Sequence, residues 1–288
     1  MFMDRRMSFA AAVTVAAVAG MNAVKSHAQV GFVATVTSTH PIAYYRLDKP
    51  AGKSQVGTTT YKSLGGVSIV TPGAPIGVAK NHSVQLNGHD GQVITTQVGG
   101  IETAASIMAW VNLGTLPSQE GRIFYVAGES QSGNDLDLQI ETDNTLRFFT
   151  AGGGNVNFVP PVATLVNQWH LIVATVDTES LVRAIYWDGK QVATDKGGGR
   201  AGKTSVFTIG ESTVFTGRFF KGAIEDAALW DRALKASEVA AIYGAATPTG
   251  SAAARNSAAS DASAPVAGKR PFATTAQVDA EDANVLSN

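Results

Sequence analysis

Regular alternation of apolar and polar residues runs through the middle of the chain. Between Val30 and Ala246, short runs rich in Val, Ile, Thr, Phe and Tyr recur at intervals of about ten residues, separated by Gly, Asn, Asp and Pro. Residues 135–141 (DLDLQIE) show the alternation most clearly, because Leu or Ile stands at every second position. In an extended strand this pattern turns apolar side chains to a core and polar ones to water. The repeated strands predict an all-β sandwich or barrel.

Turn and helix signals refine this expectation. Asp-Gly at 188–189 and Asp-Asn at 143–144 each lie between two strand-like runs, which predicts two hairpins. Segment 234–244 (LKASEVAAIYG) has apolar residues at helical spacing and ends in Gly244, which suits a helix C-terminus. We therefore expect one short C-terminal helix that packs on an edge of the sandwich.

The first 28 residues, 1–28, have the features of an export signal. Arg5 and Arg6 form a charged start, residues 7–24 are uncharged and mostly small and apolar, and a small-residue segment ends at Ala28. The arginine pair fits twin-arginine export as well as the general secretory (Sec) route. A membrane anchor is the alternative, although the segment is Ala-rich and near the lower length limit for a span. We expect cleavage and a secreted or periplasmic protein with no membrane span.

After residue 246 the amino-acid composition is no longer that of a β-sheet domain. Residues 247–271 contain no aromatic side chain and no periodic apolar positions, and they are rich in Ala, Ser and Pro. Such a segment cannot bury enough surface to offset its chain entropy. We predict a disordered tail over 247–288 and one folded domain over 29–246.

Charge and cysteine content narrow the classes of partner and chemistry. The 288 residues include 22 Lys and Arg, 23 Asp and Glu, and no Cys, which gives a formal net charge of −1. No basic stripe stands out, so nucleic acid is not an expected partner. Without cysteine there is no disulfide and no thiol chemistry, and stability must come from the core.

Five motifs follow one another in a recognisable order: SIMAWV (106–111), WHLIVATVD (169–177), AIYWDGKQV (184–192), FTIG (207–210) and FFKGAIEDAALWDRALKASEVAAIY (219–243). This order resembles one known family, the LamG (laminin-G-like) domain of the concanavalin A-like lectin/glucanase superfamily. The resemblance covers about 30–246 and rests on the order of the motifs more than on any one of them. It implies an all-β jelly-roll sandwich of two antiparallel sheets with one short C-terminal helix.

The catalytic feature to look for is a pair of carboxylates. Related glucanases of this fold carry two on one strand, one as the nucleophile and one as the acid/base. Asp135 and Glu141 would lie about 20 Å apart along a strand, too far for either hydrolytic geometry. Asp135 and Asp137 would lie about 7 Å apart, which suits only an inverting mechanism. Simple alternation already explains both acids as the water-facing side of a strand. We therefore predict no catalytic residue and keep a glycoside hydrolase using Asp135 and Asp137 as the alternative.

Calcium is the one cofactor that the resemblance raises. Members of the family use the Asp of the closing Ile-Asp-Glu stretch, and the matching positions here are Glu225 and Asp226. A second acidic segment of the family corresponds to 54–66, which contains no acid. Calcium requires six to eight oxygen ligands, including carboxylates. We predict a domain without a cofactor and keep a structural calcium at Glu225 and Asp226 as the alternative.

The resemblance and the residue types together predict a non-catalytic, exported module that binds carbohydrate or another extracellular surface. An aromatic ring would stack on the apolar face of a sugar, and amide or carboxylate groups would bind its hydroxyls. The candidate ligand-binding residues are Asn134, Asp135, Asp137, Asn155 and Trp187. Trp187 precedes a turn, so we expect it to be more exposed than the other tryptophans. A further alternative is a module that binds an extracellular or envelope protein without affinity for sugar.

Overall fold

A computed structural model describes residues 31–77, 80–96, 98, 101, 103–116, 126–130, 133–199, 206–210 and 218–246, without the side chains of 126–130, 133–135 and 206. These residues belong to one compact unit of the chain. The predicted export signal (1–28) and the predicted tail (247–288) lie outside the described residues. No helix within the described ranges is long and apolar enough to cross a membrane.

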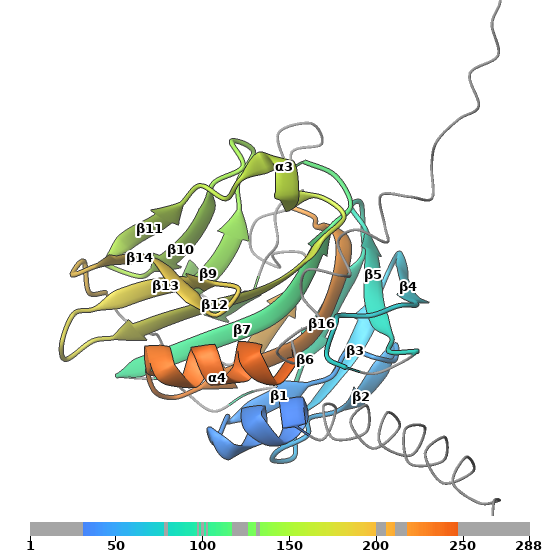
Figure 1. Ribbon diagram of the computed structural model, residues 1–288, viewed down its shortest axis with the longest axis horizontal. Helices are drawn as coiled ribbons and strands as arrows, with labels where there is room; N and C mark the ends of the chain where they lie inside the picture. The colour runs from blue at the N-terminus through green and yellow to red at the C-terminus, as the bar shows by residue number, and fades with distance from the viewer. Residues whose placement is uncertain are drawn as a thin grey trace, which may run out of the picture. The chain divides into compact units, whose positions relative to one another are not determined.

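Two eight-stranded antiparallel sheets form the domain (Figure 1). The first sheet has the order β14 (Lys190–Asp195), β13 (Arg183–Trp187), β12 (Trp169–Asp177), β7 (Ala104–Leu113), β16 (Lys221–Trp230), β5 (Ser83–Asn87) and β4 (Val67–Val70), with β1 (Ala43–Tyr45) also paired to β16. The second has the order β11 (Gly154–Phe158), β10 (Leu146–Thr150), β9 (Gly133–Ile140), β8 (Val126–Ser130), β15 (Val206–Ile209), β6 (Gln92–Thr95), β3 (Thr60–Leu64) and β2 (Ala51–Lys53). This architecture confirms the predicted sandwich.

The main core lies between the inner faces of the two sheets. Alternate residues of β7 and β12, such as Ile107 and Ile172, meet alternate residues of β9 and β10, such as Leu138 and Phe148. All four of these side chains are completely buried. The apolar positions of segment 135–141 therefore face the core as the alternation predicts, with Leu136 also fully buried.

A second apolar layer covers the outer face of the first sheet. The intervening positions of its strands, for example Trp110 in β7 and Leu171 in β12, form a separate cluster with Val239 and Ile242 of helix α4 (Ala236–Ala246). In Figure 1 this helix lies across the sheet that contains β7. The C-terminal helix is therefore confirmed, shifted by two residues from its predicted bounds. Its role is to bury a sheet face that would otherwise expose apolar side chains to water.

Residues 31–38 form a further helix, where the β-like composition from Val30 onward had suggested strand. The cause is tertiary: Phe32 and Val36, one helical turn apart, are completely buried in the second apolar layer. Trp230 donates from its indole nitrogen to the Thr39 hydroxyl at 3.0 Å, which joins this helix to β16. Packing against the outer face outweighs the strand preference of the β-branched residues. A single helical turn, α3 (Val162–Leu165), was also not predicted.

Both predicted hairpins are confirmed. Trp187 pairs with Lys190, so Asp188 and Gly189 make a two-residue turn in which both have positive φ, 51° and 77°. The second turn connects β9 to β10 and has Asn144 at φ 65°. At Gly222 in β16, a side chain would collide with the carbonyl oxygen of Asn112 on β7, which explains the glycine in that strand.

One buried arginine joins the edges of the two sheets. Arg183 in β13 is only 1% exposed, and its Nη1 donates to the Thr150 hydroxyl and the Gly154 carbonyl oxygen of the second sheet, both at 2.7 Å. Its Nε and Nη2 donate to the two carboxylate oxygens of Asp195 in β14 at 2.9 and 2.7 Å. These bonds to Arg183 are the main cause of a lowered pKa of Asp195. The charge is thereby satisfied by groups from both sheets.

Replacing Asp195 with Asn tests this contact through the pH dependence of stability. Because the side chain of Asp195 is 37% exposed, we expect Asp195→Asn to lower the free energy of unfolding at pH 7 by only about 1 kcal/mol. A folded pKa below the unfolded value stabilises the protein above the unfolded pKa of about 3.9 and loses that effect as pH falls through the folded pKa. The difference between the wild-type protein and the variant should therefore shrink below about pH 4.

Urea unfolding at pH 7 and pH 3 measures both values. Glu179→Gln, at an exposed position in the turn after β12, is the matched control and should behave as the wild type at both pH values. A difference for Asp195→Asn that stays constant between pH 7 and pH 3 would contradict the ion pair as its cause.

Candidate functional site

The outer face of the second sheet carries a polar surface built by β9, β10 and β11. Since Leu138, Phe148 and Val156 point into the core, the residues between them point outward. Strand register then places outward residues side by side: Phe149 pairs with Asp137 on one side and Asn155 on the other. Directly opposite residues on one face of an antiparallel sheet are in contact distance.

A second row of outward residues lies next to the first. Arg147 pairs with Gln139 of β9 and with Asn157 of β11. We call these two rows the outer-face patch, and its members are Asp137, Gln139, Arg147, Phe149, Asn155 and Asn157. With strands about 4.8 Å apart and residues about 3.4 Å apart along each strand, the patch measures roughly 10 by 7 Å.

Exposure differs across the outer-face patch. Asn155 and Asn157 are exposed and Phe149 is partly exposed, whereas Asp137 and Gln139 are only 3% and 7% exposed. Phe149 belongs to neither apolar cluster of the domain. Within the described part of the chain, the Oε1 atom of Gln139 is buried without a hydrogen-bond partner. The patch thus combines an accessible ring with amide groups that have unused hydrogen-bonding capacity.

Two acids at the turn after β9 hold Arg147 in place. Its Nη2 donates to Asp143 Oδ2 at 2.8 Å, and its Nη1 lies 3.4 Å from Glu141 Oε1. The backbone N–H of Thr145 is the largest of several causes that lower the pKa of Asp143, and Arg147 contributes. Arg147 is therefore neutralised locally, and its charge does not dominate the patch.

The structure brings only some of the predicted ligand-binding residues together. Asp137 and Asn155 lie on the outer-face patch, on either side of Phe149. Asp137 is nevertheless buried, so the expectation that the acids of segment 135–141 all face water is wrong for this residue. Asn134 and Asp135 lie in β9, but their side chains are outside the described residues.

Trp187 points into the space between the two sheets, and the half-buried Trp169 is more exposed, so the expectation that Trp187 is the most exposed tryptophan is wrong. Its side chain is part of the core between the sheets and is 8% exposed. The indole ring packs 4.3 Å from the His170 ring and 5.9 Å from the Phe158 ring, measured between centroids. His170 in turn contacts Asp188 at 2.8 Å and the Thr164 carbonyl oxygen at 2.8 Å. We assign Trp187 a packing role.

Phe149 is the residue that the sequence analysis missed. The signal was present in segment 145–151 (TLRFFTA), because two consecutive aromatic residues in a strand must point to opposite faces. Only one of Phe148 and Phe149 could enter the core. The structure shows that Phe148 does and Phe149 does not.

A catalytic pair is not assembled around Asp137 among the described side chains. Its direct cross-strand neighbours are Ala127 of β8 and Phe149 of β10, Asn155 follows Phe149 in the same row, and none of the three is an acid. Glu141 lies four residues further along the strand, about 13 Å away, and beside Arg147. Both glycosidase geometries require two carboxyl groups within about 5–9.5 Å. The side chain of Asp135, the other half of the alternative catalytic pair, is outside the described residues, so that pair stays a prediction.

Glu225 and Asp226, the alternative calcium residues, lie at a bulge of β16 and are completely buried. Burial raises the pKa of Glu225 to about 9, and the Asp226 carboxylate adds to the rise. Burial also raises the pKa of Asp226, to about 6, although Arg46 opposes the change. Arg46 Nε lies 2.7 Å from Asp226 Oδ1, and Arg46 Nη2 lies 3.3 Å from Glu225 Oε1.

This donor set does not fit a calcium ion. A positively charged guanidinium lies where the two carboxylates converge, and two further groups, the Tyr44 hydroxyl and the Ala74 N–H, donate to the same acids. Calcium needs six to eight oxygens that face the ion without hydrogen-bond donors between them. No group of three or more His, Cys, Asp or Glu suited to a metal occurs within the described ranges.

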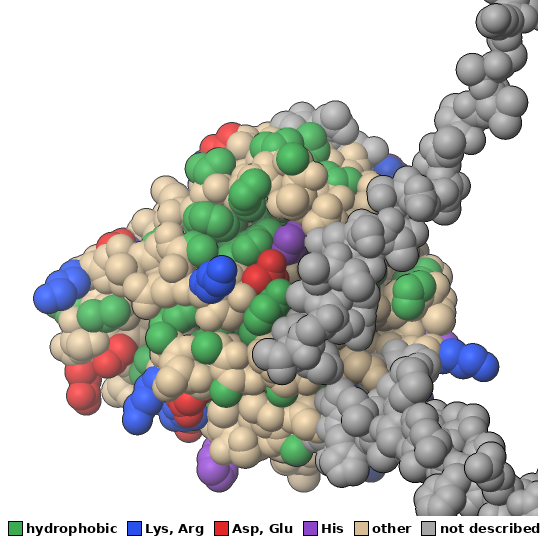
Figure 2. Space-filling model, in the orientation of Figure 1, with side chains coloured by type: hydrophobic (Ala, Val, Ile, Leu, Met, Phe, Trp, Pro, Cys, Tyr) green, Lys and Arg blue, Asp and Glu red, His purple; other side chains and the backbone are tan. Residues whose placement is uncertain are grey.

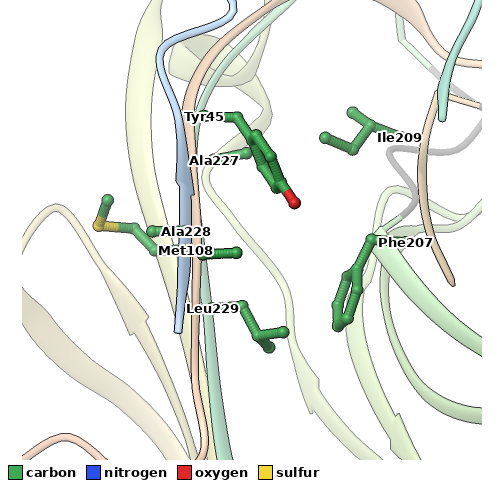
Figure 3. Close-up of a pocket in the computed structure, with 8 residues that line it drawn as sticks. Tyr45, Met108, Phe207, Ile209, Ala227, Ala228 and Leu229 are labelled. Carbon is green, nitrogen blue, oxygen red and sulfur yellow. The ribbon is translucent and has the colours of Figure 1, made fainter. Parts of the chain in front are cut away.

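One hollow in the described structure lies inside the sandwich and is apolar. Tyr45 and Leu229 of the first sheet face Phe207 and Ile209 of the second across it, while Met108 points away (Figure 3). None of the residues that line it is charged. On the face over which α4 lies, acidic and basic side chains are scattered and do not gather into one charged field (Figure 2). Neither feature competes with the outer-face patch as a site for a polar ligand.

Two stacked antiparallel sheets with a polar outer strand surface define the class of lectin-like β-sandwich domains. The chain belongs to the concanavalin A-like lectin/glucanases superfamily, whose family model Laminin_G_3 matches residues 86–240, more than half of the sequence. A comparison with curated protein sequences found no match.

Several solved structures share the fold. The receptor binding domain of botulinum neurotoxin D is 12% identical with a TM-score of 0.55, covering 70% of this chain and 52% of that one. The binding domain of Paraclostridial Mosquitocidal Protein 1 is 14% identical, TM-score 0.55, with 71% and 52% covered. The botulinum neurotoxin serotype D ligand binding domain, in complex with N-acetylneuraminic acid, is 14% identical, TM-score 0.54, with 70% and 50% covered. This chain thus spans about half the length of these neighbours, and identities this low show the fold alone.

Truncating Trp187 distinguishes a packing role from a binding role. We expect Trp187→Ala to lower the free energy of unfolding by about 3–5 kcal/mol, because it removes a buried ring and leaves a cavity. Phe149→Ala, which shortens a partly exposed ring outside both apolar clusters, should cost less than about 1 kcal/mol. Thermal and urea unfolding of both variants provide the measurement. Equal stability of Trp187→Ala and the wild type would refute the packing role.

Proposed function

We propose that this protein is an exported, non-catalytic module that binds carbohydrate on the outer-face patch. The observation that carries the proposal is the row Asp137–Phe149–Asn155, in which an accessible ring lies between an acid and an amide. Membership of a superfamily of lectins and glucanases supports a sugar ligand. So does the neighbour of like fold that is in complex with N-acetylneuraminic acid.

The chemistry of the patch suits a sugar ring. The C–H face of a pyranose would stack on Phe149, which supplies apolar contact area. Asn155 and Asn157 each offer an amide donor and acceptor at the exposed edge of the patch. A sheet surface of roughly 10 by 7 Å can contact one or two sugar rings of a polysaccharide chain. Such a shallow site favours repeated sugar units over deep burial of one small molecule.

In this proposal, export is inferred from residues 1–28. These residues have a charged start, an apolar segment and a small-residue end, which support transport across a membrane. Transport would precede folding on the Sec route and follow folding on the twin-arginine route. The proposed location is the periplasm or the exterior, where polysaccharides and envelope proteins are available as ligands.

A glycan array of plant, algal and bacterial polysaccharides and sialylated oligosaccharides, probed with the mature chain, tests the proposal. For the strongest array ligand, we expect Phe149→Ala to weaken binding about tenfold, a loss of about 1.4 kcal/mol of stacking and contact. Asn155→Ala should weaken it about fivefold, because one hydrogen bond is removed. Isothermal calorimetry measures both affinities.

Gln191→Ala is the control, because Gln191 is exposed on β14 of the other sheet and should bind as the wild type. If Phe149→Ala and Asn155→Ala both bind the array ligand as the wild type does, the binding site lies elsewhere on the domain. An array without any signal, with capture of a specific envelope protein, would support the protein-binding alternative in place of a sugar ligand.

Hydrolysis is tested separately with the same polysaccharides. We expect no reducing ends above the level of a buffer control after prolonged incubation, since the described neighbours of Asp137 in its row, Phe149 and Asn155, are not acids. Reducing ends that appear with the wild type and disappear with Asp137→Asn or Asp135→Asn would establish the enzyme alternative.

A further inference from the structure

The acidic pair at the bulge of β16 is the most unusual polar feature of the domain. Asp226 has a φ of 54°, a left-handed conformation that residues other than glycine rarely adopt. The register of β16 against β7 shifts between Glu225 and Ala228, so the bulge turns both acids toward the same buried point. Strained backbone combined with buried charge persists only where surrounding contacts compensate for it.

Strand pairing brings Arg46 to that point. Residues 43–45 of β1 pair with residues 227–229 of β16, so Arg46 follows directly opposite the bulge. The backbone N–H of Asp226 donates to the Arg46 carbonyl oxygen at 3.1 Å, which continues the pairing by one residue. The position of the guanidinium is therefore set by the same register that closes the sheet.

Donor groups occupy three of the four carboxylate oxygens. Arg46 Nη2 donates to Glu225 Oε1 at 3.3 Å, and the Ala74 N–H donates to Glu225 Oε2 at 2.5 Å. Asp226 Oδ1 accepts from the Tyr44 hydroxyl at 2.6 Å and lies 2.7 Å from Arg46 Nε. Only Asp226 Oδ2 has no hydrogen-bond partner among the described residues.

Asn81 completes the cluster, because its side chain bonds both Arg46 and Ala74. Its Oδ1 accepts from Arg46 Nη2 at 3.3 Å, and its Nδ2 donates to the Ala74 carbonyl oxygen at 3.0 Å. The segment that carries Ala74 is thereby held over the acids. The contacts of Arg46 thus come from β1, from β16 and from the segment between β4 and β5.

We propose that Arg46 is a built-in cation that replaces a divalent metal ion at the bulge of β16, so that folding of this domain is independent of metal. A corollary follows from the geometry. Removing the guanidinium leaves two buried carboxylates that converge on one vacated volume, which is the chemistry of a divalent cation site.

Thermal unfolding of the full mature chain in EDTA and in millimolar calcium tests whether folding is independent of metal. We expect the wild-type Tm to be the same in both, within about 1 °C. Arg46→Ser should lower the Tm in EDTA by about 6–20 °C, because a buried charge loses its partner. Calcium should recover part of that loss in Arg46→Ser only.

Matched variants make the outcome specific. Arg232→Ser removes an arginine that pairs with Glu238 at 2.7 Å near the surface, and its Tm should not respond to calcium. In the double variant Arg46→Ser/Asp226→Asn the calcium response should be lost, because one carboxylate of the site is gone. If Arg46→Ser does not fold in either buffer, Arg46→Lys serves in its place, and a Tm unaffected by calcium supports the proposal.

Four results would overturn it. A wild-type Tm that falls in EDTA, or wild-type calcium binding that Glu225→Gln abolishes, would show that a metal site exists beside Arg46. Folded Arg46→Ser with no calcium response would show that the guanidinium does not stand where a cation would bind. A calcium-stabilised Arg46→Lys variant would contradict the claim that one positive side chain suffices.

Discussion

Burial of both faces of the central strands of the first sheet is the constraint on which the rest of the domain depends. β7 and β12 direct residues such as Ile107 into the space between the sheets and residues such as Trp110 to the other side. Water can therefore reach neither face, and each face needs its own cover. The second sheet covers one face, and α4 with residues 31–38 covers the other. On the outer face of the second sheet, β9, β10 and β11 carry amides, charges and one partly exposed ring.

Two arginines inside this apolar framework lie where separate elements are joined. Arg183 links the edges of the two sheets, and Arg46 joins β1 to the bulge of β16 while neutralising two buried acids. Each guanidinium is largely shielded from water and surrounded by acceptors from separate segments, which is the condition under which a buried charge is tolerated. A rigid framework of this kind suits a binding module, since the outer-face patch then keeps its spacing without a ligand.

Three expectations drawn from the sequence differ from the structure, at Trp187, at residues 31–38 and at Asp137. Trp187 was expected near the surface because a turn follows it, yet strand alternation turns its ring inward against His170. Residues 31–38 suggest a strand because four of the eight are β-branched, yet an apolar sheet face nearby makes a helix the better way to bury Phe32 and Val36. Asp137 was expected in water on the pattern alone. For Trp187 and for residues 31–38, the deciding contacts come from residues outside the local stretch of chain.

Sequence alone determined the class of fold, the main strands, both hairpins and the C-terminal helix, because alternation, turn residues and helical spacing are local properties of the chain. It also suggested Asp137 and Asn155 as neighbours of a ligand. Only the tertiary structure decided that Phe149 lies between them, since strand register brings together residues from three strands. It likewise decided that Arg46 meets Glu225 across 179 residues of chain. Pairing between distant segments follows from the packing of the whole domain, and no local pattern encodes it.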